Sequence, residues 1–140
     1  MSENKTNMSF LNQFFGNKKE EVPSKIAWRN LIDLGQLKEI NTLSFEKPVF
    51  IFKHSTRCSI SRFALKNFEN EYDYTADDFY PYFLDLLEHR AISTEIAIQF
   101  GVQHQSPQLL VIKDGKCIFS ESHDGIDAMQ LQSVVDSKKD

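Results

Sequence analysis

The chain has 140 residues, of which 41% are apolar and 26% charged, as in an ordinary soluble globular protein with one core. Its net charge of −4 argues against nucleic acid as a partner, which usually demands a basic face, and no apolar stretch is long enough for a transmembrane segment. The first residues do not have the pattern expected of a secretory signal, and the two cysteines are far apart. The expected location is therefore the reducing cytoplasm, where a cysteine is more often kept for chemistry than for a disulfide.

The amino-terminal segment, residues 1–24, is predicted to be a flexible or weakly helical arm. It is polar and charged, and Pro23 breaks any regular element near its end. The apolar residues of "FLNQFF" within it recur at helical spacing, but so short a helix is marginal in water. We therefore favour an arm whose aromatic side chains pack on the domain over a helix that docks on a membrane or a partner. The domain itself is placed at residues 25–140.

The first half of the domain alternates strand and helix patterns. Residues 26–32 are a short strand candidate, and residues 34–43 have the spacing of a helix. The run "VFIFKH" at residues 49–54 is apolar without alternation, which is typical of a buried strand in a parallel sheet. From Cys58 onward apolar residues recur at steps of four, which predicts a helix whose inner side carries Ile60, Phe63, Ala64, Phe68 and Tyr72.

The second half continues the alternation. We predict a strand, a helix, a hairpin about an Asp-Gly pair and a final helix, at residues 79–87, 89–101, 108–121 and 125–137. Pro81 confines the beginning of the strand to an edge or an end of the sheet, and Gly101 closes the helix.

The element order β-α-β-α-β-α-β-β-α predicts an α/β thioredoxin-like fold, with a mixed central sheet and helices on both faces. The early βαβ units require parallel strands, and the final hairpin adds antiparallel ones. Two residues narrow the choice of fold. Cys58 lies where the second strand meets its helix, and Pro107 lies just before the hairpin, where thioredoxin-like proteins keep a cis-proline. We predict a cis Ser106–Pro107 bond rather than a trans proline that merely begins the strand.

Cys58 is the candidate nucleophile. A helix amino terminus offers unpaired N–H groups and a positive dipole end, and Arg57 adds a cation, all of which favour a thiolate. Ser61 occupies the place where a dithiol enzyme keeps its resolving cysteine; its hydroxyl can donate to the thiolate but cannot attack a mixed disulfide. The pattern predicts a monothiol site, regenerated by an outside thiol. The polar flank "STR" argues against a cysteine that serves only for packing.

The segments "FKHSTRCSIS", "FGVQHQSPQLLVIKDGK" and "SHDGI" resemble the YtxJ family, the monothiol bacilliredoxins of the bacillithiol system, over about Trp28 to Val135. The resemblance implies a thioredoxin-like protein that removes bacillithiol from mixed disulfides by taking this low-molecular-weight thiol onto Cys58. It implies no permanently bound cofactor, bacillithiol as co-substrate, and S-thiolated client proteins as partners. The chain departs from the family at Ser59, where members commonly carry proline or glycine, and this change bears on the rigidity of the first helical turn.

A substrate groove is predicted beside the cysteine. In a thioredoxin fold the residue before the cis-proline offers its backbone to an extended substrate, which assigns this role to Ser106, with Pro107 behind it. Thr56 and Arg57 would form the opposite lip. Bacillithiol carries a malate with two carboxylates, so the Arg57 cation would favour it over a neutral thiol.

Two other functions stay open at this point. One is a general protein-thiol or glutathione-linked reductase with the same chemistry, and the other is a redox-silent thioredoxin-like adaptor. Cys117 lies within a strand without an activating neighbour and is predicted to serve for packing, unless exposure makes it a second thiol. The histidines His54, His104 and His123 could gather at the active face, but we predict no metal site, because lone histidines near a thiol more often hydrogen-bond than bind metal.

Overall fold

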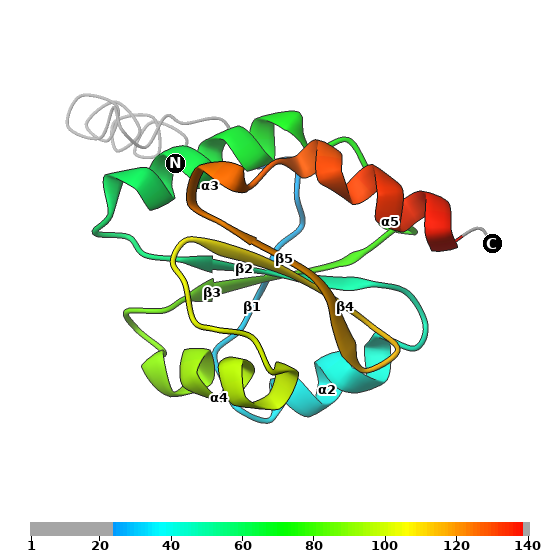
Figure 1. The fold of residues 1–140 in the computed structure, drawn as a ribbon, viewed down its shortest axis with the longest axis horizontal. Helices are drawn as coiled ribbons and strands as arrows, with labels where there is room; N and C mark the ends of the chain where they lie inside the picture. The colour runs from blue at the N-terminus through cyan, green and yellow to red at the C-terminus, as the bar shows by residue number, and fades with distance from the viewer. Residues whose placement is uncertain (1–23, 139–140) are drawn as a thin grey trace, which may run out of the picture.

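The computed structural model describes residues 24–138, so the predicted arm lies outside the described residues except for Ser24. Strands and helices follow one another in the predicted order (Figure 1). They are β1 (Arg29–Asn30), α2 (Gln36–Leu43), β2 (Val49–His54), α3 (Ser59–Glu71), β3 (Tyr80–Asp85), α4 (Arg90–Phe100), β4 (Gln108–Lys113), β5 (Lys116–Ser122), the short 3-10 helices η2 (His123–Gly125) and η3 (Ala128–Gln130), and α5 (Leu131–Lys138).

A five-stranded sheet of order β1-β3-β2-β4-β5 forms the middle layer. Strands β1, β3 and β2 run parallel, whereas β4 is antiparallel to both β2 and β5. Helices α3 and α5 cover one face of the sheet, and α2 and α4 cover the other (Figure 1). The predicted α/β thioredoxin-like architecture, with an antiparallel hairpin at one edge, is confirmed. No helix within residues 24–138 is long and apolar enough to cross a membrane.

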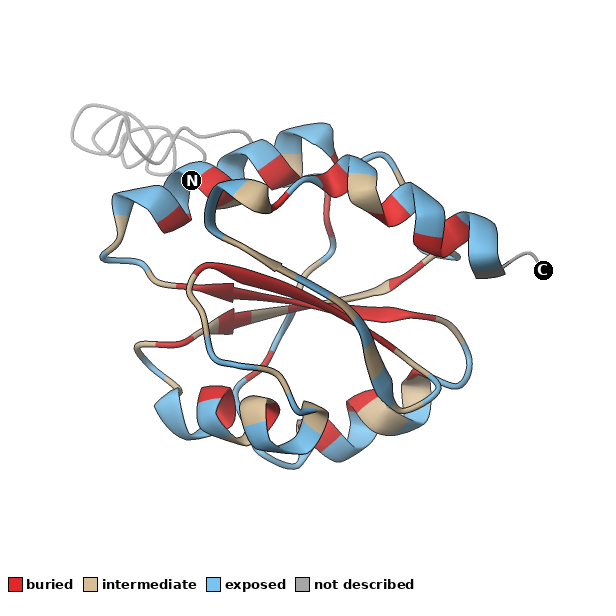
Figure 2. Cartoon of the chain, viewed as in Figure 1, coloured by how far each residue is buried: buried red, intermediate tan, exposed pale blue. Residues whose placement is uncertain are grey.

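Strand β2 lies in the centre of the sheet, and all six of its residues are buried (Figure 2). Because successive side chains point to opposite faces, Phe50 and Phe52 join the core beneath α3 and α5, while Val49 joins the core beneath α2 and α4. The same alternation places its last two residues, Lys53 and His54, on opposite faces. Two polar side chains are thereby buried at the end of β2 that leads to Cys58.

Helix α3 differs from the prediction at two positions, while Ala64, Phe68 and Tyr72 are buried as predicted. Ile60 and Phe63, predicted to face inward, are 56% and 68% exposed. The helix also buries Ser61, which the prediction did not place on the inner side and which lies seven residues, or about two turns, before Phe68. The prediction was wrong at Ile60 and Phe63 because it assigned the inner side by apolarity, whereas the fully buried Ser61 is held there by hydrogen bonds. Two large apolar side chains therefore remain on the surface close to Cys58.

The terminal elements are shorter than predicted. Strand β1 spans Arg29–Asn30 rather than residues 26–32 and pairs with only two residues of β3. The final helix begins at Leu131, because the preceding η3 is a 3-10 turn capped by the Asp127 side chain, which accepts the N–H of Met129.

The predicted turns are confirmed. Gly101 ends α4 in the left-handed conformation, with φ of 65°. Asp114 and Gly115, between β4 and β5, have φ of 52° and 79°, as a tight hairpin with two positive φ angles requires. Pro81 precedes the part of β3 that pairs with β1, so its missing N–H leaves no gap in that pairing.

Candidate active site

Cys58 is the N-cap residue of α3 and has an extended backbone, with φ of −106° and ψ of 121°. Its thiol is free and half-buried. The Cys58 N–H donates to the carbonyl of Ser55 at 3.1 Å, and its own carbonyl accepts the N–H of Arg62 at 3.1 Å. These bonds join the turn after β2 to the first turn of α3. An N-cap side chain lies beside the first unpaired N–H groups of its helix, at the positive end of the helix dipole.

Ser61 is fully buried, one turn further along α3. Its Oγ lies 2.8 Å from Nδ1 of His54 and accepts the N–H of Ser55 at 3.0 Å. The sequence analysis predicted that this hydroxyl can donate a hydrogen bond to the Cys58 thiolate. In the structure it is bonded to the end of β2 and to the following turn. Ser61 therefore connects this turn to the first turn of α3 through hydrogen bonds.

His54 is only 5% exposed, and its ring lies 5.5 Å from that of Phe83. Burial lowers the pKa of His54; the charge of Asp85 opposes this shift and that of Arg62 adds to it. The neutral imidazole is therefore favoured at neutral pH. The sequence identified His54 only as one of several histidines, and its partnership with Ser61 emerges from the fold.

On the opposite face of the sheet, Lys53 is fully buried and lacks a carboxylate among its described hydrogen-bond partners. Its Nζ lies 2.7 Å from Nδ1 of His104 and donates to Oε1 of Gln108 at 3.0 Å. Burial lowers the pKa of Lys53 to about 8. Burial, and then the charge of Lys53, lower the pKa of His104. A lysine within "VFIFKH" and a glutamine that opens "QLLVI" were the only sequence signals for this network.

Gln108 extends the network toward the predicted groove. Its Nε2 donates to the carbonyl of Gln103 at 3.0 Å, and its Oε1 accepts the N–H of Gln105 at 3.4 Å. The Ser106–Pro107 bond that follows is cis, as predicted. The carbonyl of Pro107 accepts the N–H of His123, the first residue of η2, at 3.1 Å. The segment before β4 is thus anchored on both sides.

The sheet register brings this segment toward the Cys58 turn. Lys53 and Gln108 are the last paired residues of β2 and β4. Ser55 is the first residue after β2, and Ser106 lies two residues before β4, so the two predicted sides of the groove both begin next to this last pair of the sheet. Thr56 and Arg57, predicted as the opposite lip, are exposed in the turn between β2 and α3.

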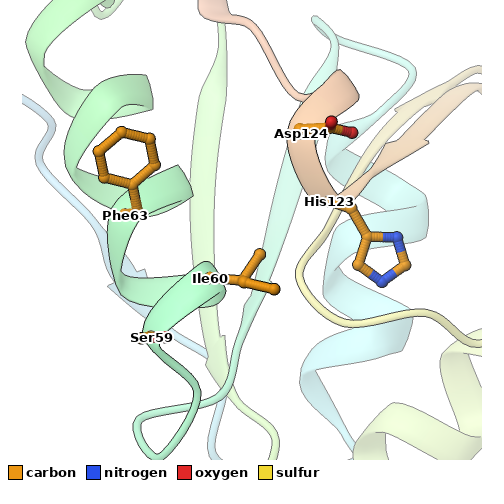
Figure 3. Close-up of a pocket in the computed structure, with 5 residues that line it drawn as sticks. All are labelled: Ser59, Ile60, Phe63, His123 and Asp124. Atoms are coloured by element: carbon orange, nitrogen blue, oxygen red, sulfur yellow. The ribbon is translucent and has the colours of Figure 1, made fainter.

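A hollow of about 690 Å³ lies beside the Cys58 turn, between α3 and η2. It is lined by Ser59, Ile60, Phe63, His123 and Asp124, and Figure 3 shows Ile60 extending from the first turn of α3 toward η2. His123 has a positive φ of 54°, which is uncommon for a residue with a side chain. The predicted site did not include this hollow, because Ile60 and Phe63 were assigned to the core.

Cys117 lies away from this site. It pairs with Ile112 near the hairpin turn, whereas Ser122, at the other end of β5, pairs with Gln108 beside the groove. Its side chain packs against the core beneath α2 and α4, and its Sγ donates to the carbonyl of Phe119 at 3.3 Å. Burial raises the pKa of the Cys117 thiol. Within residues 24–138, no group of three or more His, Cys, Asp or Glu side chains is placed to hold a metal ion.

The fold and the thiol at the start of α3 define a thioredoxin-fold thiol–disulfide oxidoreductase. Among solved structures, a candidate oxidoreductase with a thioredoxin fold is similar, with a TM-score of 0.62 and 28% identity over 74% of this chain and 89% of that one. Thioredoxin Mala s 13 of Malassezia sympodialis shares the fold, with a TM-score of 0.61 and 21% identity over 84% and 96% of the two chains. Thioredoxin of Fasciola hepatica has a TM-score of 0.58 and 14% identity over 78% and 97%.

A comparison with family models defines the class of protein more closely than the fold does. A family model described as monothiol bacilliredoxin BrxC matches residues 29–131, from β1 to the first residue of α5. The chain belongs to the monothiol bacilliredoxin family, as the resemblance to the YtxJ proteins indicated. Its function is thiol redox chemistry.

Proposed function

We propose that the protein removes bacillithiol from S-thiolated client proteins, with Cys58 as the nucleophile and no resolving thiol. The observation that carries this proposal is the pairing of an N-cap cysteine with a buried serine three residues later, in a member of the monothiol bacilliredoxin family. The chain has only one other cysteine, and Cys117 lies near the far end of the hairpin. A disulfide formed on Cys58 therefore has no partner within the chain to break it.

The reaction is a pair of thiol–disulfide exchanges. In the first, the Cys58 thiolate attacks the bacillithiol sulfur of the client's mixed disulfide. A bond forms between Cys58 and bacillithiol as the client's disulfide breaks, and the electron pair leaves on the client sulfur, which takes up a proton from water. The client cysteine is reduced and Cys58 is oxidised. In the second, a bacillithiol thiolate attacks the adduct, which yields bacillithiol disulfide and restores the Cys58 thiolate.

Three features support these steps. The free N–H groups at the start of α3 favour negative charge on Cys58 both as nucleophile and as leaving group. Arg57, exposed beside it, offers a cation to the carboxylates of bacillithiol. The burial of Ser61 and its two hydrogen bonds keep the turn that carries Cys58 in place.

The test is intact mass spectrometry of the full chain exposed to bacillithiol disulfide and, separately, to glutathione disulfide. We expect one adduct on the unmodified protein, none on Cys58→Ser, and an unchanged adduct on the matched variant Cys117→Ser. Rate constants should favour bacillithiol disulfide, and a bacillithiolated client should be reduced by the protein but not by Cys58→Ser. Faster reaction with glutathione disulfide would favour the glutathione-linked reductase. Absence of any adduct would favour the adaptor.

A further inference from the structure

Ile60 and Phe63 leave an apolar surface uncovered beside the active cysteine. They are 56% and 68% exposed, and both line the hollow between α3 and η2 (Figure 3). Single exposed apolar side chains are ordinary, whereas apolar side chains gathered at one place on the surface are typical of an interaction site. At about 690 Å³, the hollow has the size of a site for a drug-sized ligand. It can therefore accept bulky apolar side chains.

The same chain carries a segment of matching chemistry. Residues 10–15 read "FLNQFF", with apolar side chains at the first two and the last two positions. In a helix this spacing gathers the four apolar side chains on one side. The sequence analysis predicted that the aromatic side chains of this segment pack on the domain, but it did not identify the place. The segment lies outside the described residues, so its place must be inferred from the described ones.

The described part of the chain begins beside α3. Nζ of Lys25 donates to the carbonyl of Asn70, in the last turn of α3, at 3.1 Å. Ile26, the next residue, is buried in the core beneath α3 and α5. The chain that precedes Lys25 is therefore tethered to one end of the helix whose other end lines the hollow.

The length of chain before this tether matches the span to the hollow. Asn70 lies seven residues after Phe63 and ten after Ile60, which corresponds to about 10 to 15 Å along a helix. Nine residues, 16–24, separate the segment from Lys25. A chain of this length has an r.m.s. end-to-end distance of about 16 Å. The effective concentration of a tethered segment is highest when these two lengths agree.

The charges along the path are complementary. The residues that follow "FLNQFF" read "GNKKEEVP", so the two glutamates stand nearer the tether and the two lysines stand nearer the aromatic residues. On α3, the exposed cations Lys66 and Arg62 lie between Asn70 and the hollow in the sequence. The hollow itself is lined across from α3 by the carboxylate residue Asp124. A segment that runs back along α3 therefore brings each pair of charges toward the opposite sign.

We propose that residues 10–15 dock in the hollow between α3 and η2 of the same molecule, with Phe14 and Phe15 against Ile60 and Phe63. The docked segment covers the apolar surface beside the active cysteine in the free protein. A protein client that lies over the hollow displaces it. This inference goes beyond the proposed function and does not depend on it, because docking requires no reaction at the cysteine.

A nitroxide label in the segment tests where it lies. The label is attached through Asn12→Cys in the full chain, which also carries Cys58→Ser and Cys117→Ser so that one thiol remains. Nitroxide broadening of amide resonances falls steeply with distance. Because a tether of matching length gives an effective concentration in the millimolar range, we expect the Ile60 resonance to lose more than about half of its intensity relative to the reduced label. The resonance of Ile98 on α4, on the opposite face of the sheet, should keep its intensity (Figure 1).

Paired variants test whether the apolar side chains hold the segment. Phe63→Glu should restore the lost intensity, whereas the equally exposed Ile98→Glu should not. Within the segment, Phe14→Ser combined with Phe15→Ser should also restore it, and the polar replacement Gln13→Ser should not. Broadening that survives both Phe63→Glu and the double serine variant would overturn the inference.

A mixed sample distinguishes the segment of the same molecule from that of a second copy. Chain that carries the nitroxide is mixed with isotope-labelled chain that does not, and we expect no broadening of the Ile60 resonance in the mixture. Broadening there would mean that the segment docks on a second copy, and would overturn the inference. Broadening that is absent or evenly spread in the singly labelled chain would overturn it as well, and would leave the hollow open in the free protein. None of these outcomes bears on the proposed function, because the labelled chain lacks Cys58.

Discussion

The Ser61 hydroxyl lies 2.8 Å from Nδ1 of His54, and the same oxygen accepts the N–H of Ser55 at 3.0 Å. One side chain therefore joins the end of β2, the turn that leads to Cys58 and the first turn of α3. In a dithiol enzyme this position carries the second reactive sulfur. Here the position holds a buried serine whose hydroxyl is hydrogen-bonded within the fold, so Cys58 is the only thiol in this turn and the first turn of α3.

Replacing Ser61 by cysteine should convert the site to a dithiol. In Ser61→Cys we expect a small thiol bound to Cys58 to be expelled spontaneously, leaving an internal disulfide, because a sulfur three residues away on the first helical turn can attack the adduct. The adduct of the unmodified protein should persist until a second thiol is added. Intact mass spectrometry of preformed adducts over time checks both. Spontaneous loss from the unmodified protein would mean that another group resolves the adduct.

His54 should make the folded state sensitive to acid. Burial lowers the pKa of His54 below 6.5, so as the pH falls through that value the unfolded chain binds a proton that the folded chain resists. Stability from this group is complete at about pH 7 and is lost toward pH 5. We expect His54→Asn, which offers an acceptor but does not titrate, to lose less stability over this range than the unmodified protein. Urea midpoints at pH 7 and pH 5 provide the measurement, and an equal loss in both proteins would contradict the prediction.

Lys53 should affect the stability of the folded state at alkaline pH. Burial lowers the pKa of Lys53 from 10.5 to about 8, so below pH 8 both states are protonated and the folded state carries the full desolvation penalty. Between these values the folded chain loses the proton first, and the penalty is relieved. We expect the unmodified protein to gain stability relative to Lys53→Met between pH 7 and about pH 9.5, as urea midpoints would record. Lys66→Met, at an exposed position on α3, controls for the general loss of a positive charge. If the unmodified protein gained as much stability relative to Lys66→Met as relative to Lys53→Met, the assignment to Lys53 would be contradicted.

The exposed apolar residues beside Cys58 should matter for protein clients. Under the proposed function, a client that brings its sulfur to Cys58 would lie over the adjacent hollow, which Ile60 and Phe63 line. We expect Phe63→Glu to lower kcat/KM for a bacillithiolated protein by about tenfold while changing the rate with bacillithiol disulfide much less. Ile98→Glu on α4 is the matched control, since Ile98 is 69% exposed and Phe63 is 68% exposed. Equal effects of the two variants on kcat/KM would mean that the hollow does not take part in client binding.

Local patterns in the sequence were sufficient for most of the architecture. The apolar run of β2, the helical spacing of α4 closed by Gly101, and the Asp-Gly hairpin are each encoded within a few residues. Such patterns report the local backbone, because strands and helices have fixed side-chain periods and tight turns need particular residues. The place of Cys58 at a strand-to-helix junction followed from the same patterns, and so did the thioredoxin-like order.

Only the tertiary structure decided which side chains meet. The inner side of α3 was predicted incorrectly at Ile60 and Phe63, because the bonds that bury Ser61 come from another element. Lys53 and Gln108 are 55 residues apart, and the sequence contains no local sign that the register of β2 and β4 pairs them. Within residues 24–138 the buried Ser106 hydroxyl has no hydrogen-bond partner, and this could not be predicted either, since an unmet hydrogen bond is defined by everything that surrounds it. Periodicity is a property of one segment, whereas satisfaction of a buried polar group depends on segments that the fold brings together.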